Sequence, residues 1–244
     1  MNVSSRPRKA RLSVNLLGRH PEPGFCKTRL IPALGPEGAA EAHAVLLTHV
    51  VGTVRRWCAD SPSERLFRLW TTSPLSTPFL DTLADDGQMR VQPEGDLGVR
   101  LAAISQAGLA EAEGVLLVGG DAVSLDPASF NHTETLLSSH DAVLIPALDG
   151  GYVALALRRF QPELFMAMPW GTERLAEKTR TVFRRLGWSW GEIPGHWDVD
   201  FPREWERFRR LEKSWSNNCS TSSVSGEGRS GEPVKEGARK ESLR

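Results

Sequence analysis

Two basic side chains stand one residue apart in the stretch PEPGFCKTRLIPALG, which follows a short apolar run near the N-terminus. Lys27 and Arg29, with Arg19 just upstream, are cations that could hold a polyphosphate, and arginine can grip one through two parallel hydrogen bonds. Two prolines stiffen the loop, and Gly24 would let its backbone approach a ligand. The stretch lacks both the Walker glycine spacing and the dinucleotide fingerprint. By spacing alone, a diphosphate clamp and a solvated basic turn remain equally open.

Carboxylates follow two later segments in positions that suit a metal ion. Asp121 comes directly after the apolar run GVLLVGG, where a carboxylate commonly holds a divalent cation that bridges phosphates. In WDVDFPREW, Asp198 and Asp200 are one residue apart, so an extended chain would turn both to one side. Capping is the simpler alternative, for Asp121 in the turn that follows it and for Asp200 before the helix that opens on Pro202. The pattern predicts a Mg²⁺ or Mn²⁺ site from these acids.

Two more segments carry candidate ligand contacts. GDLGVRL places Asp96 and Arg100 at an expected helix N-terminus, which favours an anion or a ribose-phosphate. A capped helix with an exposed acid–base pair is the alternative. PALDGGYVALAL places Asp149, two glycines and the chain's only tyrosine between apolar runs, although Asp-Gly by itself is also the common hairpin turn.

Strand and helix patterns alternate around these segments. Expected strands cover residues 11–17, 65–72, 114–120, 141–147 and 152–157, and expected helices cover 37–59, 96–112, 172–187 and 202–213. Such alternation predicts a three-layer α/β/α sandwich with a mainly parallel sheet. Ligands bind these sheets at the carboxyl ends of the strands, and most of the candidate residues follow strands.

Composition narrows the class of protein. The 244 residues carry 30 basic and 30 acidic side chains, so no global basic field points to nucleic acid. Three scattered cysteines without metal-ligand spacing indicate reduced thiols in a cytoplasmic protein. No apolar run is long enough to span a bilayer. We expect one domain over residues 11–213, between a tail of residues 1–10 and a Ser/Gly/charged tail of residues 214–244 that cannot offset its ordering entropy.

Taken together, six segments resemble a bacterial family of GT-A-type glycosyltransferases formerly described as a domain of unknown function (DUF2064), some members of which are linked to arsenosugar biosynthesis. The segments are PEPGFCKTRLIPALGPEGA, QPEGDLGVRL, LLVGGDAVSLDP, ALDGGYVALAL, MPWGTERLAEKT and WDVDFPREW. They occur in the family's order and cover the chain from about Leu12 to Leu211. A weaker similarity, through the KTRL-like loop, extends to nucleotidyltransferases such as 2-phospholactate guanylyltransferase.

The resemblance implies a GT-A fold that takes a nucleotide-diphospho-sugar donor and a small-molecule acceptor. It assigns the phosphates and nucleotide to Arg19, Lys27, Arg29, Asp96 and Arg100. It assigns Mg²⁺ or Mn²⁺ to Asp121 together with Asp198 or Asp200. It assigns the sugar or acceptor to Asp149, Gly150, Gly151, Tyr152 and Trp170. Asp149 would be the candidate base, and the metal-binding Asp121 would share in catalysis.

The sequence departs from the family pattern in two places. Arg19 stands at a position that usually holds lysine, which keeps the charge. GGDAVSL stands where the family usually reads GSDSPDL, so Asp121 remains while Val123 takes the proline position and Ser124 replaces the second acid. A site with one fewer carboxylate is expected to bind metal more weakly, or to depend more on the ligand's phosphates.

Three functions therefore stay open. The first is metal-assisted glycosyl transfer from a nucleotide sugar. The second is nucleotidyl transfer from an NTP to a phosphorylated small molecule, with release of pyrophosphate. The third is binding of a nucleotide sugar without catalysis, for which the altered GGDAVSL segment is the motive.

Overall fold

The computed structural model describes residues 9–72, 77–85 and 87–221, with side chains as far as residue 214. The chain divides into two units, residues 1–206 and 207–244. Its elements in chain order are β1 Ala10–Gly18, η1 Thr28–Leu30, α1 Ile31–Ala59, β2 Arg65–Thr71, α2 Pro78–Asp81, β3 Met89–Val91, α3 Leu97–Glu111, β4 Ala112–Gly119, α4 Pro127–Leu137, β5 Ala142–Pro146, β6 Tyr152–Leu157, η2 Pro162–Leu164, α5 Leu175–Leu186, β7 Trp190–Glu192 and α6 Pro202–Thr221. None of the described helices has an apolar stretch long enough to cross a membrane.

A seven-stranded sheet forms the centre of the first unit, in the order β3-β2-β1-β4-β6-β5-β7. β1 pairs in parallel with both β2 and β4, so that Leu12 lies between Arg65 and Gly114. β6 runs antiparallel to both of its neighbours, β4 and β5. The other described strands run in one direction. The predicted mainly parallel sheet is therefore confirmed, with β6 as the reversed strand.

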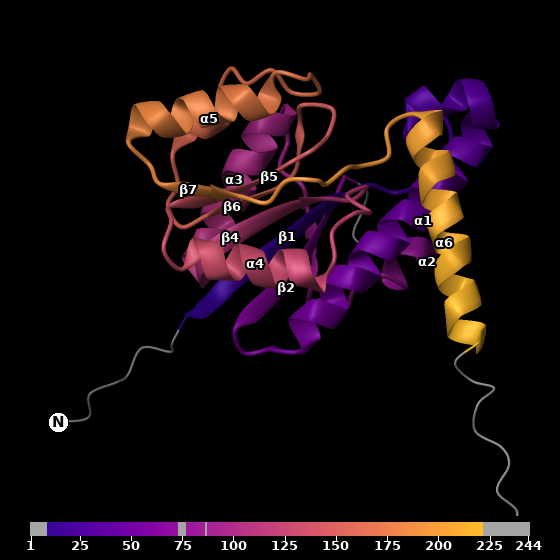
Figure 1. Ribbon diagram of the computed structural model, residues 1–244, viewed down its shortest axis with the longest axis horizontal. Coiled ribbons are helices and arrows are strands. Elements are labelled where there is room, and N and C mark those ends of the chain that lie inside the picture. The colour runs from indigo at the N-terminus through magenta and orange to yellow at the C-terminus, as the bar shows by residue number, and fades with distance from the viewer. Residues whose placement is uncertain (1–8, 73–76, 86, 222–244) are drawn as a thin grey trace, which may run out of the picture. The chain divides into compact units, whose positions relative to one another are not determined.

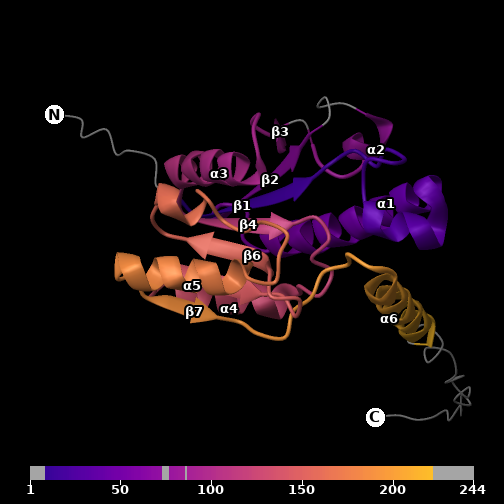
Figure 2. The same ribbon diagram turned by 90° about the horizontal axis from the view of Figure 1, so that it is seen from above.

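Helices cover both faces of this sheet (Figures 1 and 2). On one face α1 packs beside α4, where the Trp57 and Phe130 rings lie 5.0 Å apart. On the other face α3 and α5 enclose a core that includes Ile104, Leu155 and Phe183, each fully buried. Burial of such apolar side chains is the main stabilising contribution. The three predicted layers are confirmed.

Local chemistry fixes where the helices begin and end. The Asp96 side chain accepts a hydrogen bond from Val99 N–H and so caps α3, and Asp126 caps α4 in the same way through Ser129. Each cap contributes about 1 kcal/mol. α5 ends at Gly187, whose φ of 64° is the left-handed conformation that glycine adopts without steric penalty. Gly187 thus ends α5, and Asp126 fixes the start of α4.

Several elements differ from the sequence-based expectation. The short strands β3 and β7 have three residues each, too few to show an alternating pattern. α1 begins at Ile31 but is broken at Gly35, with φ 71°, directly before Pro36, so its regular part starts close to the expected residue 37. α6 continues to Thr221, past the expected end at Lys213. Residues 1–8 and 222–244 of the two predicted tails lie outside the described residues.

The turn between β5 and β6 packs tightly on the chain that leads into α5. Gly150 has φ 90°, and a Cβ there would lie 2.1 Å from the carbonyl oxygen of Glu173. We expect Gly150→Ala to lower the free energy of unfolding by about 3 kcal/mol, through this clash and the left-handed backbone. Urea unfolding of the variant and of the natural protein measures this loss of stability. Gly171→Ala is the matched control, because Gly171 has φ 72° but open space around it, and should lose only about 1 kcal/mol. Equal losses in the two variants would contradict the packing argument.

Candidate functional site

The loop after β1 holds Lys27 in the left-handed backbone conformation, with φ 46° and ψ 44°. For a residue other than glycine this costs roughly 1–2 kcal/mol, and such strain clusters at functional sites. The Lys27 side chain is only 8 % exposed, and its ammonium donates to Asp121 and, at 3.0 Å, to Asp200. The predicted phosphate loop and two of the predicted metal ligands therefore meet.

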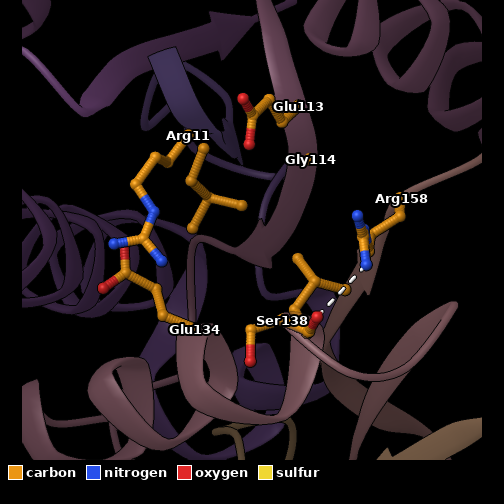
Figure 3. A pocket seen from close by; sticks show the side chains of 8 residues that line it. Arg11, Glu113, Gly114, Glu134, Ser138 and Arg158 are labelled. Atoms are coloured by element: carbon orange, nitrogen blue, oxygen red, sulfur yellow. Dashed lines mark hydrogen bonds between the residues drawn. The ribbon is translucent and has the colours of Figure 1, made fainter.

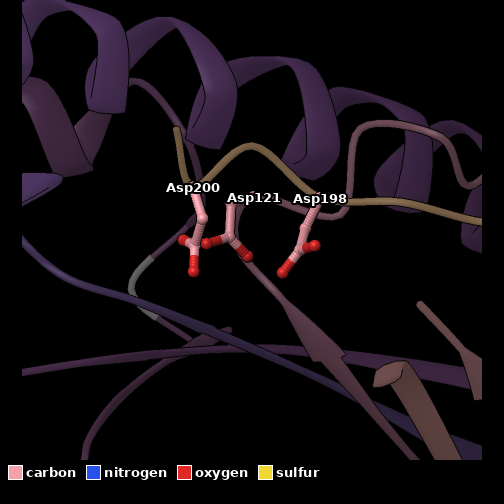
Figure 4. Close-up of side chains that lie close together, drawn as sticks. All are labelled: Asp121, Asp198 and Asp200. Carbon is pink, nitrogen blue, oxygen red and sulfur yellow. The ribbon is translucent and has the colours of Figure 1, made fainter. Parts of the chain in front are cut away.

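Three carboxylates gather at this point, as Figure 4 shows. Asp121 follows the carboxyl end of β4, while Asp198 and Asp200 come from the segment before α6. One oxygen from each lies within 4.8 Å of those of the other two. The intervening Val199 is fully buried, so the two acids that flank it both face the cluster. This is the one-sided arrangement that their spacing predicted.

The charges in the cluster are unevenly balanced. Burial favours a neutral amine at Lys27, but the Asp121 and Asp200 carboxylates outweigh it and raise the Lys27 pKa. Burial likewise opposes ionisation of Asp121, but the Lys27 ammonium holds the Asp121 pKa below its usual range. Burial, and then the charges of Asp121 and Asp200, raise the pKa of Asp198 to about 7. The three carboxylates therefore outnumber the two cations that pair with them, the Lys27 ammonium and the Arg29 guanidinium.

This donor set fits a hard divalent cation. Mg²⁺ and Mn²⁺ prefer carboxylate oxygens, and such ions use one or two protein carboxylates plus the phosphates of a substrate. Asp121 and Asp198 are close enough to bind one ion. The raised pKa of Asp198 reflects its burial and the excess of negative charge in the cluster, and a divalent cation would neutralise that charge.

The two arginines of the predicted clamp have different surroundings. Arg29 is half exposed and donates to Asp200 at 2.5 Å, with its guanidinium 5.1 Å from the centre of the Phe201 ring. Its remaining donors can reach a ligand in solvent. Arg19 donates to the carbonyl oxygen of Phe25 at 2.7 Å and so braces the loop. Asp200 thus binds Lys27 and Arg29, while the first turn of α6 is held by a bond from Phe201 N–H to Glu204.

Asp96 and Arg100 lie at the N-terminus of α3, as predicted. Asp96 serves as its cap, and the Arg100 guanidinium donates to the carbonyl of Gly95 and to the Gln92 side chain. Among the described residues no hydrogen bond or ion pair joins either one to the carboxylate cluster. Their predicted contact with a nucleotide remains a prediction.

A cavity of about 230 Å³ opens beside the cluster, at the carboxyl ends of β1 and β4. Its polar wall contains Asp149, Asp198 and Asp200. Its apolar and aromatic wall is formed by Leu17, Leu97, Leu101, Leu117, Val118, Val153, Ala154, Leu175, Tyr152 and Trp170. The Tyr152 and Trp170 rings meet edge to face, with centres 6.3 Å apart.

The DGG turn shapes one end of this cavity. Asp149 and Gly151 line it, and one carboxylate oxygen of Asp149 accepts the Gly151 N–H at 2.8 Å. Gly150 contributes the tight turn between them. The Tyr152 hydroxyl is buried and has no hydrogen-bond partner among the residues that the structure describes, and burial raises its pKa. The predicted sugar- or acceptor-binding residues and the predicted metal ligands therefore adjoin one cavity.

Another cavity, of about 160 Å³, lies at the opposite ends of the strands (Figure 3). It is formed near the amino ends of β1 and β4, with Arg11, Glu113 and Glu134 in its wall, and Arg158 donates to the Ser138 carbonyl across it. Sheets of this type bind ligands at the carboxyl ends of their strands. The cavity beside the carboxylates is therefore the candidate site.

Two further residues support the cluster, and the sequence did not single them out for this. Ser124 was noted only as a missing acid, yet its hydroxyl binds the main chain of Trp197 beside Asp198. His43 is buried on α1, with Nε2 3.2 Å from the carbonyl oxygen of Arg19. Burial and the charge of Lys27 lower the His43 pKa. A lone histidine on an apolar helix face carries no signal of this contact.

Comparison with known proteins bears on the whole arrangement. Residues 57–172 match a family described as an uncharacterized protein conserved in bacteria (DUF2064). This match confirms the resemblance. The matched range contains the GDLGVRL, GGDAVSL and DGGY segments, whereas the KTRL loop and WDVDFPREW lie outside it. No curated protein matches the chain.

Solved structures share the fold. A Desulfovibrio desulfuricans G20 protein, provisionally described as a nucleotide-diphospho-sugar transferase, superposes with a TM-score of 0.68 at 24 % identity over 79 % of this chain and 83 % of its own. 4-Diphosphocytidyl-2C-methyl-D-erythritol synthase from Anaerococcus prevotii DSM 20548 gives 0.54 at 13 % identity, over 84 % and 96 %. CMP:2-keto-3-deoxy-manno-octonic acid synthetase complexed with CTP gives 0.50 at 12 %, over 84 % and 99 %. The chain therefore has the nucleotide-diphospho-sugar transferase fold.

Proposed function

We propose that this protein is a metal-assisted glycosyltransferase that uses a nucleotide-diphospho-sugar donor and a small-molecule acceptor. One observation carries the proposal: the Lys27 ammonium meets the Asp121, Asp198 and Asp200 carboxylates beside a cavity at the carboxyl end of the sheet, and Asp198 and Asp200 line that cavity. Cations and metal-binding acids bind the diphosphate on one side, and the cavity receives the sugar and acceptor on the other.

The diphosphate end relies on charge. Arg29 has donors left over from its bond to Asp200, and Lys27 adds a cation that its low exposure keeps in place. Asp121 and Asp198 would hold Mg²⁺ or Mn²⁺, which supplies Lewis-acid stabilisation of the leaving nucleoside diphosphate. Groups fixed in place before the reaction stabilise developing charge without reorganisation.

The residues that line the cavity favour binding of an uncharged sugar or an acceptor with a hydroxyl group. Its wall contains three carboxylates and no lysine, arginine or histidine among the described residues that line it. An anionic substituent there would lose its hydration and meet like charges. The flat Trp170 and Tyr152 rings suit the apolar face of a sugar ring. Asp149 is the residue we propose to accept the acceptor hydroxyl's proton if the reaction inverts.

Nucleotidyl transfer is the second candidate. It is favoured by the fold that this chain shares with CMP:2-keto-3-deoxy-manno-octonic acid synthetase and 4-diphosphocytidyl-2C-methyl-D-erythritol synthase. The same cations and metal would then bind a triphosphate. A phosphorylated acceptor would have to enter a cavity whose described lining residues include no basic side chain, which weighs against this function. Non-catalytic binding is the third candidate, because Ser124 replaces an acid that the family usually has. Asp198 weakens this argument, since it supplies a carboxylate to the cluster.

Two assays separate the candidates. Incubation with UDP-, GDP-, ADP- and dTDP-sugars and Mn²⁺ should release free sugar and a nucleoside diphosphate from at least one donor, while NTPs with phosphorylated acceptors should release no pyrophosphate. The preferred donor should also raise the melting temperature by mass action, and its uronic-acid counterpart should bind at least tenfold more weakly because of the cavity carboxylates. Pyrophosphate release would favour the second candidate, and binding without turnover the third. No melting shift with any nucleotide would exclude both enzymatic functions.

A further inference from the structure

The hydroxyl of Ser124 joins two segments that carry the carboxylate cluster. It donates to the Trp197 carbonyl oxygen at 2.6 Å and accepts from Trp197 N–H at 2.8 Å. Ser124 lies three residues after Asp121, and Trp197 directly precedes Asp198. Both main-chain polar groups of the residue before Asp198 are therefore tied to the loop that carries Asp121.

Neighbouring contacts dock the same segment but do not reach Asp198 as directly. His196 Nδ1 lies 3.2 Å from the Ser124 carbonyl oxygen, and its Nε2 lies 3.3 Å from the Ser129 hydroxyl. Leu148 N–H donates to the His196 carbonyl oxygen. These contacts fix the chain before Trp197. The Ser124 hydroxyl fixes the peptide group that leads into Asp198 itself.

A serine can form this pair of bonds and an aspartate cannot. A hydroxyl donates one hydrogen bond and accepts others, whereas an ionised carboxylate only accepts. With an acid at position 124, the bond to the Trp197 carbonyl oxygen would be lost and another negative charge would stand near Asp121 and Asp198. The residue that departs from the family pattern is thus chemically matched to its contact.

We propose that Ser124 is a positioning residue, which holds Asp198 against Asp121 so that the two can share a divalent cation. This inference rests on the proposed function, because it concerns the metal site of that reaction. Groups that orient metal ligands typically change metal affinity by 10- to 100-fold when they are removed. Ser124 does not itself need to contact the ion.

Mn²⁺ titration followed by electron paramagnetic resonance tests this without an activity assay, because bound Mn²⁺ loses the free ion's signal. Ser124→Ala should weaken binding about tenfold or more. Ser124→Thr keeps the hydroxyl and should bind within about threefold of the natural protein. Ser124→Cys keeps the volume but has only weak hydrogen-bonding capacity, so it should resemble Ser124→Ala even if the alanine variant folds poorly.

Ser189→Ala is the matched control. The Ser189 hydroxyl also accepts from a main-chain N–H and donates to an oxygen, both of Asp141, but at the amino end of β5, away from the cluster. It should leave Mn²⁺ affinity unchanged. Equal affinities in the natural protein, Ser124→Ala and Ser124→Cys would overturn the inference while leaving the metal site intact. Failure of the natural protein to bind Mn²⁺, with or without a nucleoside diphosphate, would overturn the metal site and the inference together.

Discussion

Lys27→Met is expected to weaken binding of a nucleoside diphosphate or its sugar about a hundredfold and to abolish the rise in melting temperature that the nucleotide causes. The ammonium would bind phosphate oxygens, and a charge-assisted bond of this kind is worth about 1.5–3 kcal/mol. Methionine keeps the length of the side chain without its charge. Calorimetric titration and thermal unfolding measure the two effects.

The same substitution should also expose the role of Lys27 in the free protein. Without the ammonium, Asp121 and Asp200 lose the cation that they share, and leaving these partly buried carboxylates without it should lower the free energy of unfolding by about 2 kcal/mol. Mn²⁺ should restore part of this loss because it replaces the missing charge. Lys178→Met, at an exposed position on α5, is the charge-matched control and should change neither property. A full nucleotide-induced shift in Lys27→Met would disprove the phosphate clamp.

Asp198→Asn is expected to stabilise the metal-free protein above pH 7 while weakening Mn²⁺ binding at least a hundredfold. In the folded protein the pKa of Asp198 is raised to about 7, by burial and by the neighbouring Asp121 and Asp200 carboxylates. The folded state therefore holds a proton that the unfolded state has already released, so stability falls as pH rises from about 4 to 7. After allowance for solvent screening, this penalty is on the order of 2 kcal/mol.

Asparagine removes that penalty together with the metal ligand. Urea unfolding in EDTA at pH 5 and pH 8 should show the variant gaining more stability over the natural protein at the higher pH, because the penalty is only partly developed at pH 5. Asp141→Asn provides a control of opposite sign. Although partial burial opposes its ionisation, hydrogen bonds from Ser189 and the charge of Arg159 hold the Asp141 pKa low, so this variant should lose stability. If Asp198→Asn were less stable than the natural protein at pH 8 in EDTA, the repulsion within the cluster would be disproved.

Local sequence patterns predicted most of the elements. Amphipathic helices, and apolar strands bounded by glycine, can be predicted from short-range patterns in the sequence. The reason is that side chains repeat their direction every 3.6 residues in a helix and every two residues in a strand. Caps such as Asp96 and Asp126 depend on residues three positions away. The strands β3 and β7, with three residues each, are too short for any period. The reversed direction of β6 depends on pairing with strands distant in sequence.

The candidate site divides in the same way. Its residues were visible in the sequence, because Lys27, Asp121 and Asp149 each follow a strand and Asp198 lies shortly before a helix. Their grouping was foreseeable too, because carboxyl ends of parallel strands share one edge of a sheet. The assignments of Asp96 and Arg100 to a nucleotide remain untested predictions.

What only the tertiary structure decided is how these charges are balanced and held. Lys27 and Asp200 are 173 positions apart in the chain, yet their side chains lie 3.0 Å apart, and no local pattern encodes such a contact. Burial, together with the charges of Asp121 and Asp200, raises the pKa of Asp198. In the sequence, Ser124 was notable only because it replaces an acid of the family pattern. In the folded protein its hydroxyl binds the chain beside another acid, because a hydroxyl's partners are set by three-dimensional packing and not by its neighbours in sequence.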